Sequence, residues 1–321
     1  MKIFITGISG FIGSYLAEYL IKYYPNSEIF GLVRRSNDFV NTQKIKNKVK
    51  LVNGDILDYK RIDSLFKKIK PDWVFHLAAK IFPRFVKEVS EQMMEINIIG
   101  TLNLLKASKN QIPKAKIFIA SSAAVYGNVR ATNLPIKETC QVEPIDAYGS
   151  SKACAEILSI QYFKTFGLKI IIARTFNLLA PNRGKTFIEN NFLAQIKSIR
   201  TNNTKPTILT GNLNTYRDFL DVRDTVKAYV ELMKNGKSGE IYNVCSNKMI
   251  SIKRILNIML QNTGLKNTAK IIVDPLCVRS IDIKKSLGNN SKIIRQTSWR
   301  PKIPIEQSLK ELLNNEKLLV G

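Results

Sequence analysis

The chain begins with Met1-Lys-Ile-Phe-Ile-Thr-Gly7-Ile-Ser-Gly10-Phe-Ile-Gly13. The apolar run 2–6 predicts a buried strand, and helical periodicity over 12–24 follows the glycines at once. Glycines permit a tight turn, and the N-terminus of a helix offers free N–H groups to a pyrophosphate. We therefore expect a dinucleotide to bind at Gly7, Gly10, Phe11, Ile12 and Gly13. The alternative is a structural turn without a ligand.

The same alternation of strand and helix continues over roughly the first 175 residues, which is typical of βαβ units and a parallel sheet. Strands are expected at 2–6, 28–33, 50–53, 73–77, 115–120 and 169–173. Helices are expected at 12–24, 59–70, 91–109 and 147–166. The fold class is therefore α/β, a Rossmann-type doubly wound parallel sheet.

The pattern becomes irregular after Asn177. A further strand is expected at 240–245, and helices are expected at 252–262 and 305–316. We expect a dinucleotide-binding domain over 1–177, to which 216–246 returns. A smaller, discontinuous C-terminal substrate lobe is expected from 178–215 and 247–321.

The composition excludes several classes of protein. Apolar residues make up 45% of the chain, which suits a globular protein, and no apolar stretch approaches the roughly 18 residues that span a bilayer. The four cysteines have no paired spacing, which favours reduced thiols in a cytoplasmic protein. His76 is the single histidine, so neither a histidine metal site nor a Ser-His-Asp triad is expected.

The formal net charge of +25 raises the possibility of a nucleic-acid partner. The lysines, however, stand singly or in pairs on polar helix positions, without a long basic tail. We interpret the charge as a solvated basic surface, with no nucleic-acid and no membrane partner. Such a surface also attracts a doubly anionic substrate such as a nucleotide diphosphate.

The end of the second expected strand bears on the choice of cofactor. NAD-specific folds commonly place an acid there for the ribose hydroxyls, whereas this chain has Arg34 and Arg35. Two guanidinium groups can hold a 2′-phosphate, which favours NADP over NAD. The alternative is that both arginines are ordinary surface charges.

Tyr148 and Lys152 lie four residues apart and so face the same side of a helix. A nearby cation lowers the pKa of a phenol, which lets tyrosine exchange a proton near neutral pH. Ser122 follows the strand 115–120 just upstream and can hydrogen-bond the substrate oxygen that Tyr148 protonates. These three residues are the predicted catalytic set, although a YxxxK spacing by itself is common.

Taken together, these motifs resemble the extended short-chain dehydrogenase/reductases over essentially the whole chain. The matching residues, in their usual order, are Gly7–Gly13, Asp55, Ile56, His76-Leu77-Ala78-Ala79, Asn97, Ser122, Tyr148, Lys152 and Arg174–Asn177. The resemblance implies that Asp55 and Ile56 touch the adenine and that Lys152 binds the nicotinamide ribose. It also implies that Leu77, Ala78, Ala79, Asn97 and Tyr148 contribute to the cofactor site. His76 is interpreted as a packed motif residue, and Lys80 stands where an uncharged polar residue is commoner.

Within that family the arginines after the second strand resemble the GDP-mannose 4,6-dehydratase group. Those dehydratases need a glutamate two residues before the tyrosine of the strand-end motif, where this chain has Ala124 beside Ala123. Elimination of water needs an acid and a base at that end of the sugar, and methyl groups supply neither. Dehydration is therefore not expected.

The C-terminal half contains the segments Tyr216–Asp224, Gly239–Ser246, Val273–Arg279 and Trp299–Pro301. In these segments it instead resembles the GDP-4-dehydro-6-deoxy-D-mannose reductases. This resemblance implies that Asn177, Arg217 and Arg279 hold the nucleotide diphosphate, although Arg217 could instead pair with Asp218 or Asp221. It implies reduction of the C4 keto group of GDP-4-dehydro-6-deoxy-D-mannose to GDP-D-rhamnose, or to GDP-6-deoxy-talose. We expect the protein to be a homodimer. One alternative is a nucleotide-sugar epimerase with tightly bound NAD, and another is a catalytically silent nucleotide-sensing or nucleic-acid-binding relative.

Overall fold

The computed structural model describes residues 1–34, 45–81, 90–180, 187–202, 206–277 and 283–314. Its central element is a seven-stranded sheet in which every neighbouring pair is parallel, in the order β10-β6-β5-β4-β1-β2-β3. The strands are β1 (Lys2–Thr6), β2 (Glu28–Val33), β3 (Lys50–Asn53), β4 (Trp73–His76), β5 (Lys116–Ser122), β6 (Lys169–Thr175) and β10 (Ile241–Val244). The predicted Rossmann-type sheet is confirmed.

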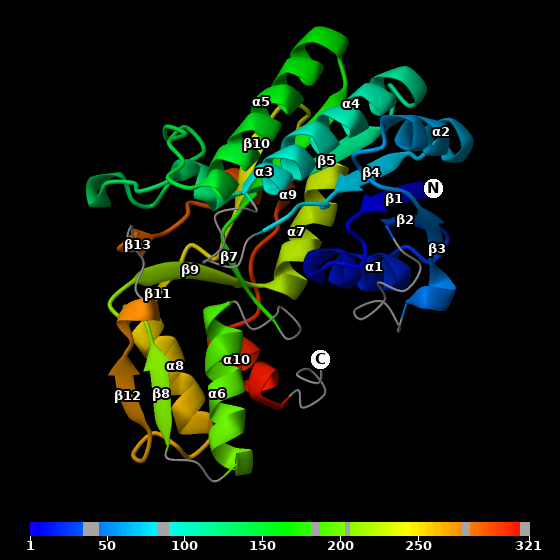
Figure 1. Cartoon of the computed structure of the whole chain (residues 1–321). Helices are drawn as coiled ribbons and strands as arrows, with labels where there is room; N and C mark the ends of the chain where they lie inside the picture. The colour runs from blue at the N-terminus through cyan, green and yellow to red at the C-terminus, as the bar shows by residue number, and fades with distance from the viewer. Residues whose placement is uncertain (35–44, 82–89, 181–186, 203–205, 278–282, 315–321) are drawn as a thin grey trace.

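Helices cover both faces of this sheet (Figure 1). On one face lie α2 (Tyr59–Ile69), α4 (Gly100–Gln111) and α5 (Ala147–Phe166); on the other lie α1 (Phe11–Tyr23), α7 (Val222–Asn235) and α9 (Ser291–Thr297). Successive side chains of β1 point to opposite faces of the sheet: Ile3 and Ile5 pack with α1, and Phe4 packs with α2. Burial on both faces explains why these strands read as continuous apolar runs.

The remaining elements form a smaller layer beside the carboxyl ends of the strands (Figure 1). A four-stranded sheet contains β7 (Asn177–Leu179), β9 (Tyr216–Asp221), β11 (Met249–Ser251) and β13 (Lys285–Ser286). A two-stranded parallel sheet contains β8 (Thr207–Thr210) and β12 (Lys270–Val273). The helices of this layer are α6 (Ile188–Asn202), α8 (Ile252–Asn262) and α10 (Ile305–Asn314), and they share a core with β8 and β9.

The segment 216–246, expected to return to the dinucleotide-binding domain, is divided between the two layers. Its strand β9 lies in the small sheet, whereas α7 packs on the large sheet and β10 becomes its edge strand. The division occurs at Asp221, which caps α7 by accepting a hydrogen bond from the Arg223 backbone N–H.

Two acids of this segment also hold the C-terminal part of the chain. Asp221 accepts from the Ser308 hydroxyl, and Asp224 accepts from the backbone N–H groups of Lys302 and Ile303. The tail is therefore fixed to the start of α7. Within the described residues, no helix has the length and apolarity that crossing a membrane requires.

Candidate active site

The glycine turn after β1 has the geometry of a phosphate cradle. Gly7 has φ +72°, and a Cβ on Gly13 would lie 2.1 Å from the Gly7 carbonyl oxygen. Glycine is therefore required where α1 begins immediately behind the turn. Gly10 caps α1 without a side-chain hydrogen bond to its first turn. The residues present fit a dinucleotide, because a larger side chain at Gly13 would fill the cradle.

A cavity of about 280 Å³ opens in front of this turn. It is lined by predicted cofactor residues from four strand ends, namely Gly7, Gly10, Arg34, Asp55, Ile56, Leu77, Ala78 and Ala79. The Asp55 side chain accepts from the Leu57 backbone N–H, which fixes the loop after β3. The structure thus brings together residues that are up to 72 positions apart in the sequence.

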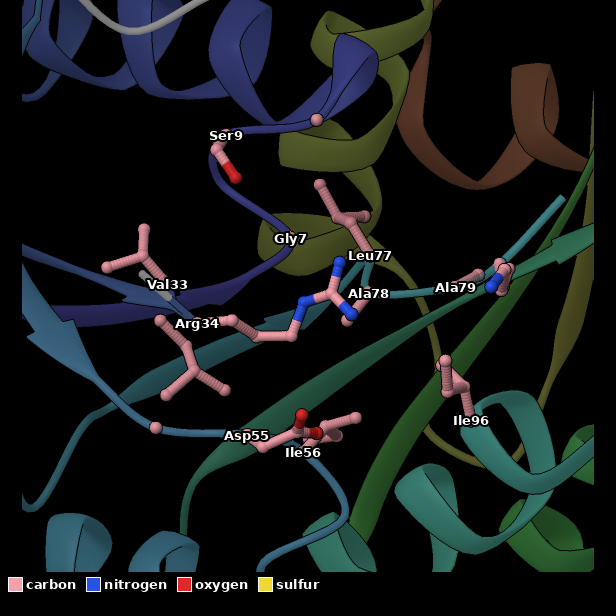
Figure 2. A pocket seen from close by; sticks show the side chains of 14 residues that line it. Gly7, Ser9, Val33, Arg34, Asp55, Ile56, Leu77, Ala78, Ala79 and Ile96 are labelled. Atoms are coloured by element: carbon pink, nitrogen blue, oxygen red, sulfur yellow. The ribbon is translucent and has the colours of Figure 1, made fainter. Parts of the chain in front are cut away.

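Arg34 extends into this cavity. Its side chain reaches between Asp55 and Leu77, so that the guanidinium group lies over the middle of the pocket (Figure 2). Arg34 is exposed to solvent and lines the cavity, as expected for a residue that contacts a cofactor. Arg35, the second arginine of the prediction, lies outside the described residues.

His76 is buried and packed, as interpreted from the sequence. Its Nδ1 lies 2.8 Å from Thr6 Oγ1 and its Nε2 lies 3.0 Å from Thr101 Oγ1. The Thr101 hydroxyl donates its hydrogen to the Asn97 carbonyl, so His76 Nε2 donates to Thr101 and Nδ1 accepts from Thr6. Burial, with a smaller contribution from Lys152, lowers the pKa of His76 to about 3.

Asn97 lies in a π-helical segment, Glu95–Ile99, between α3 (Ser90–Met94) and α4. Its amide nitrogen donates to the Lys80 carbonyl and to Ser151 Oγ, and its amide oxygen accepts from the Lys80 N–H. Ser151 in turn donates to the Tyr148 carbonyl. Asn97, predicted to bind the cofactor, therefore joins the loop after β4 to α5, the helix that carries Tyr148 and Lys152.

The predicted catalytic residues meet where α5 begins beside the end of β5. Tyr148 is half-buried, and its ring centroid lies 6.0 Å from the Nζ of Lys152. Lys152 is buried and donates to the Ala120 carbonyl at 2.8 Å. Burial lowers the pKa of Lys152 to about 8, against the opposite effect of Glu156. A buried ammonium beside a phenol stabilises negative charge on the phenol oxygen.

Ser122 ends β5 and begins a 3₁₀ turn, Ala123–Tyr126. Its hydroxyl oxygen accepts from the Ala124 backbone N–H at 3.2 Å. The turn packs against the first turn of α5, where a Cβ on Gly149 would lie 2.6 Å from the Ala124 carbonyl oxygen. The absence of a side chain at Gly149 therefore allows Tyr148 to approach the strand end.

Asn177 and Arg217 lie on the paired strands β7 and β9 of the small sheet. Asn177 Nδ2 donates to the Asp218 carbonyl, and Arg217 Nη1 donates to the Tyr216 carbonyl. The carboxylate of Asp218 accepts from Ser246, Asn247 and Gly288, and that of Asp221 from Arg223 and Ser308. These acids therefore have other donors than Arg217. Arg279 lies outside the described residues.

A model of the GDP-mannose 4,6-dehydratase family matches residues 4–312. The chain belongs to this family.

Individual members of the family include both dehydratases and reductases. The GDP-6-deoxy-D-mannose reductase of Pseudomonas aeruginosa is 29% identical over 314 residues, covering 98% of this chain and 96% of that protein. GDP-mannose 4,6 dehydratase 1 of Arabidopsis thaliana is 27% identical, covering 98% of this chain and 91% of that protein. The solved structure of RMD from Pseudomonas aeruginosa complexed with NADPH has a TM-score of 0.84 and 29% identity, and the match covers 98% of this chain and 97% of that one.

Membership in the GDP-mannose 4,6-dehydratase family confirms the resemblance to the extended short-chain dehydrogenase/reductases. The chain is therefore an enzyme of the NAD(P)-dependent oxidoreductases that modify nucleotide sugars. Identities of 29% to the reductase and 27% to the dehydratase do not decide between these two reactions.

Sequence reasoning missed part of the wall of the dinucleotide cavity. The additional lining residues are Ser9, Leu32, Val33, Gly54, Lys80 and Ile96. Most of them adjoin a predicted residue, so their position at a strand end was the available signal. Lys80, whose contacts the sequence left open, is held through its backbone by Asn97, and its Nζ contacts Gln92.

Proposed function

We propose that this enzyme reduces the C4 keto group of a 4-keto-6-deoxy nucleotide sugar. The proposed substrate is GDP-4-dehydro-6-deoxy-D-mannose, and the proposed product is GDP-D-rhamnose, or GDP-6-deoxy-talose if the sugar presents its other face. The observation that carries the proposal is the turn Ala123–Tyr126, which places methyl groups beside an otherwise complete Ser122, Tyr148 and Lys152 set.

The side chains of this set support reduction at C4. A bound nicotinamide cofactor supplies the hydride. The Tyr148 hydroxyl protonates the developing alkoxide, and the Ser122 hydroxyl donates a hydrogen bond to the same oxygen. The buried ammonium of Lys152 stabilises negative charge on the Tyr148 oxygen after the proton has left.

The same turn argues against dehydration of a hexose. Departure of a C6 hydroxyl group requires an acid, and removal of the C5 proton requires a base. Ala123 and Ala124 are both partly exposed at the end of β5, and neither side chain can exchange a proton. The enzyme therefore depends on another protein for its keto sugar.

We propose NADPH as the physiological cofactor. The guanidinium group of Arg34 lies over the cavity that the adenosine half would occupy, and arginine holds a phosphate through two parallel hydrogen bonds (Figure 2). NADPH is also the cofactor bound to RMD from Pseudomonas aeruginosa.

We also propose that the enzyme is a homodimer that uses the outer faces of the π-helical segment and α5. Ile99 is 44% exposed and Ile157 is 66% exposed on these neighbouring helices. Association would remove these two apolar side chains from water, and a twofold axis would place the two copies of this face against each other. Ile157→Arg should convert a dimer into a monomer in sedimentation analysis, whereas Ile157→Leu should not.

A direct experiment distinguishes the proposed reaction from dehydration. The purified enzyme is incubated with NADP and GDP-mannose, and the sugar is followed by NMR. We expect GDP-mannose to remain unchanged, although it can still bind. Formation of the 4-keto-6-deoxy sugar at an enzymatic rate would require another acid and would overturn the proposal.

A further inference from the structure

A buried ion pair lies directly behind the catalytic residues. Arg174 of β6 and Glu156 of α5 have side chains that are 4% and 3% exposed. The Arg174 Nη2 lies 2.7 Å from one Glu156 carboxylate oxygen, and its Nε lies 2.9 and 3.2 Å from the two oxygens. The pair is therefore bidentate and excluded from water.

The pair is connected to the strand that carries the catalytic serine. The Ser121 hydroxyl donates to Glu156 Oε1 at 2.5 Å, and Lys152, one helical turn earlier, donates to the Ala120 carbonyl at 2.8 Å. Two consecutive residues of β5 are thus attached to two consecutive turns of α5. The next residue of the strand is Ser122, so these contacts set the position of its hydroxyl relative to α5.

A second set of contacts holds the arginine from its other side. The Arg174 guanidinium lies 4.7 Å from the centroid of the Tyr126 ring, and its Nη1 donates to the Glu138 carbonyl. The Tyr126 hydroxyl donates to Asn243 Oδ1, and the Asn243 N–H donates to Glu138 Oε1. Arg174 therefore has little freedom to move away from Glu156.

Such an arrangement is not an efficient source of stability. The cost of removing two charges from water often exceeds their mutual attraction, so apolar residues of similar volume can do as well. The position of the pair relates it to the catalytic residues instead. The Glu156 carboxylate binds Ser121 of β5, and α5, the helix of Glu156, also carries Tyr148 and Lys152.

We propose that Glu156 is a positioning residue for catalysis: held by Arg174, it binds Ser121, sets the end of β5 against α5, and provides the counter-charge that keeps the Lys152 ammonium in place. The proposal rests on the proposed keto-sugar reduction for its kinetic test. It also predicts a property of Lys152 that can be measured without any sugar.

The charge of Glu156 has a defined effect on Lys152. Burial lowers the pKa of the Lys152 ammonium to about 8, and the Glu156 carboxylate acts in the opposite direction. Around this site, His76 of β4 is neutral and Arg174 is paired with Glu156. Tyr148 lies beside Lys152 on the same helix, and Tyr229 of α7 is bound to Thr175 and has its pKa raised by burial. Loss of the Glu156 charge should therefore lower the pKa of Lys152 further.

The first test uses Ser121→Ala, which removes only the hydroxyl bonded to Glu156. We expect kcat with NADPH and the keto sugar to fall by roughly 10-fold, because small displacements of reacting groups are costly, while KM changes less than about 2-fold. Ser159→Ala is the matched control, since Ser159 is likewise a buried serine but lies on α5 and donates within its own helix to the Ala155 carbonyl. If Ser121→Ala behaves like Ser159→Ala, Glu156 does not position the strand end.

The second test separates charge from geometry with Glu156→Gln and Glu156→Asp. Activity requires a protonated Lys152, so kcat of the wild-type enzyme should decline above about pH 8. In Glu156→Gln this decline should begin about one pH unit lower, since one unit corresponds to a tenfold change in the protonation equilibrium. Glu156→Asp keeps the charge and should retain the wild-type pH profile despite a lower kcat. An unchanged pH profile in Glu156→Gln would overturn the proposal.

The third measurement does not depend on the substrate. Lysine labelled with ¹³C at Cε should give one resonance that titrates near pH 8, well below the ordinary lysine value of about 10.4. Its absence from Lys152→Met assigns it to Lys152. We expect this titration to move to lower pH in Glu156→Gln, and a stationary titration contradicts the proposal. If the titration moves but the keto sugar is not reduced, only the proposed substrate is wrong.

Discussion

At the scale of single residues, Tyr148, the proposed proton donor, and Lys152, the cation beside it, lie in different environments. The phenol is half-buried and can meet a substrate, whereas the ammonium is buried and hydrogen-bonded to the Ala120 carbonyl. A buried cation is less screened than an exposed one and therefore acts more strongly on its neighbour. The four-residue spacing, together with Ser122 at the end of the strand just upstream, predicted this pair.

Tyr148→Phe should lower the rate of the chemical step by at least ~10²-fold, because it removes the proposed proton donor. Affinity for NADPH should change little. Single-turnover oxidation of NADPH measures the rate, and cofactor fluorescence measures the affinity. Tyr59→Phe, which removes a hydroxyl bonded to Asp63 on α2, should be as active as the wild-type enzyme. A Tyr148→Phe enzyme with more than about a tenth of wild-type turnover would show that Tyr148 is not the acid.

Replacement of both Arg34 and Arg35 by alanine should weaken NADPH binding by ~10- to 100-fold, since each charged hydrogen bond to a phosphate contributes about 1.5–3 kcal/mol. NADH binding should change less than about 3-fold. Titration of both cofactors measures the difference. The exposed residues Arg130 and Arg200 provide a control with the same change in net charge when both are replaced by alanine. Equal losses for NADPH and NADH would mean that these arginines do not recognise the 2′-phosphate.

Residue patterns could predict that Arg34 lines the cofactor cavity and that His76 is packed. They could not predict the hydrogen bonds that Asn97 makes. The role of Asn97 depends on the π-helical segment Glu95–Ile99, which turns its amide towards Lys80 and Ser151. The sequence predicted one regular helix over 91–109. A local change in helical winding has no clear periodic signal, so only the structure reveals this contact.

At the scale of elements, the first half of the chain was predicted almost to the residue. Strands β1, β2 and β3 and helix α5 have the expected bounds. Strands β1 and β2 are apolar runs buried within the sheet, and α5 is bounded by its N-cap Asp146 and by Gly167 in the left-handed conformation, so these elements carry strong local signals. Helices α6, α7 and α9 were not predicted. Helix α7 has a clear buried stripe and an aspartate cap, so the sequence did contain its signal. The short strands of the small sheets depend on partners distant in sequence and carry little signal of their own.

Gly13→Ala should disrupt the junction between β1 and α1. Its Cβ would lie 2.1 Å from the Gly7 carbonyl oxygen, whereas a Cβ on Gly10 would lie 3.1 Å from the same atom. We expect Gly13→Ala to lose at least ~100-fold in NADPH affinity and to unfold at a lower temperature, because overpacking costs about 1–3 kcal/mol. Gly10→Ala should be affected less in both measurements. Wild-type cofactor affinity in Gly13→Ala would contradict the phosphate cradle.

Asp218 should make the stability of the small sheet dependent on pH. Burial raises the pKa of Asp218 from 3.8 to about 6, against the hydrogen bonds that it accepts from Ser246, Gly288 and Asn247. The folded state therefore binds this proton more tightly than the unfolded state, and its contribution to stability falls as the pH rises from about 4 to about 6.

The free energy of unfolding of wild type relative to Asp218→Asn tests this dependence, because other titrating groups cancel in the difference. The advantage of the wild type should be greater at pH 4 than at pH 7.5, by on the order of 3 kcal/mol. Urea unfolding at both pH values measures it. A difference that does not vary with pH would mean that burial does not disturb the Asp218 carboxyl.

At the scale of the whole molecule, two layers of unequal size meet at the carboxyl ends of the large sheet (Figure 1). The large layer carries the dinucleotide cavity and the Tyr148–Lys152 helix, and the small layer carries Asn177 and Arg217. We propose that the sugar nucleotide binds between them, with its diphosphate towards Arg217. The sequence could predict both sets of residues, but the division of 216–246 between the layers depends on strand pairing that no local pattern encodes.

The central claim is that the enzyme transfers hydride to C4 of a 4-keto-6-deoxy nucleotide sugar, and isotope transfer tests it most directly. The enzyme is supplied with freshly prepared GDP-4-dehydro-6-deoxy-D-mannose and with NADPH that carries two deuterium atoms at C4 of the nicotinamide. Our account predicts stoichiometric oxidation of the cofactor and one deuterium atom at C4 of a 6-deoxyhexose product, detected by NMR and mass spectrometry. A sugar that is recovered unreduced, or a product without deuterium at C4, would contradict it.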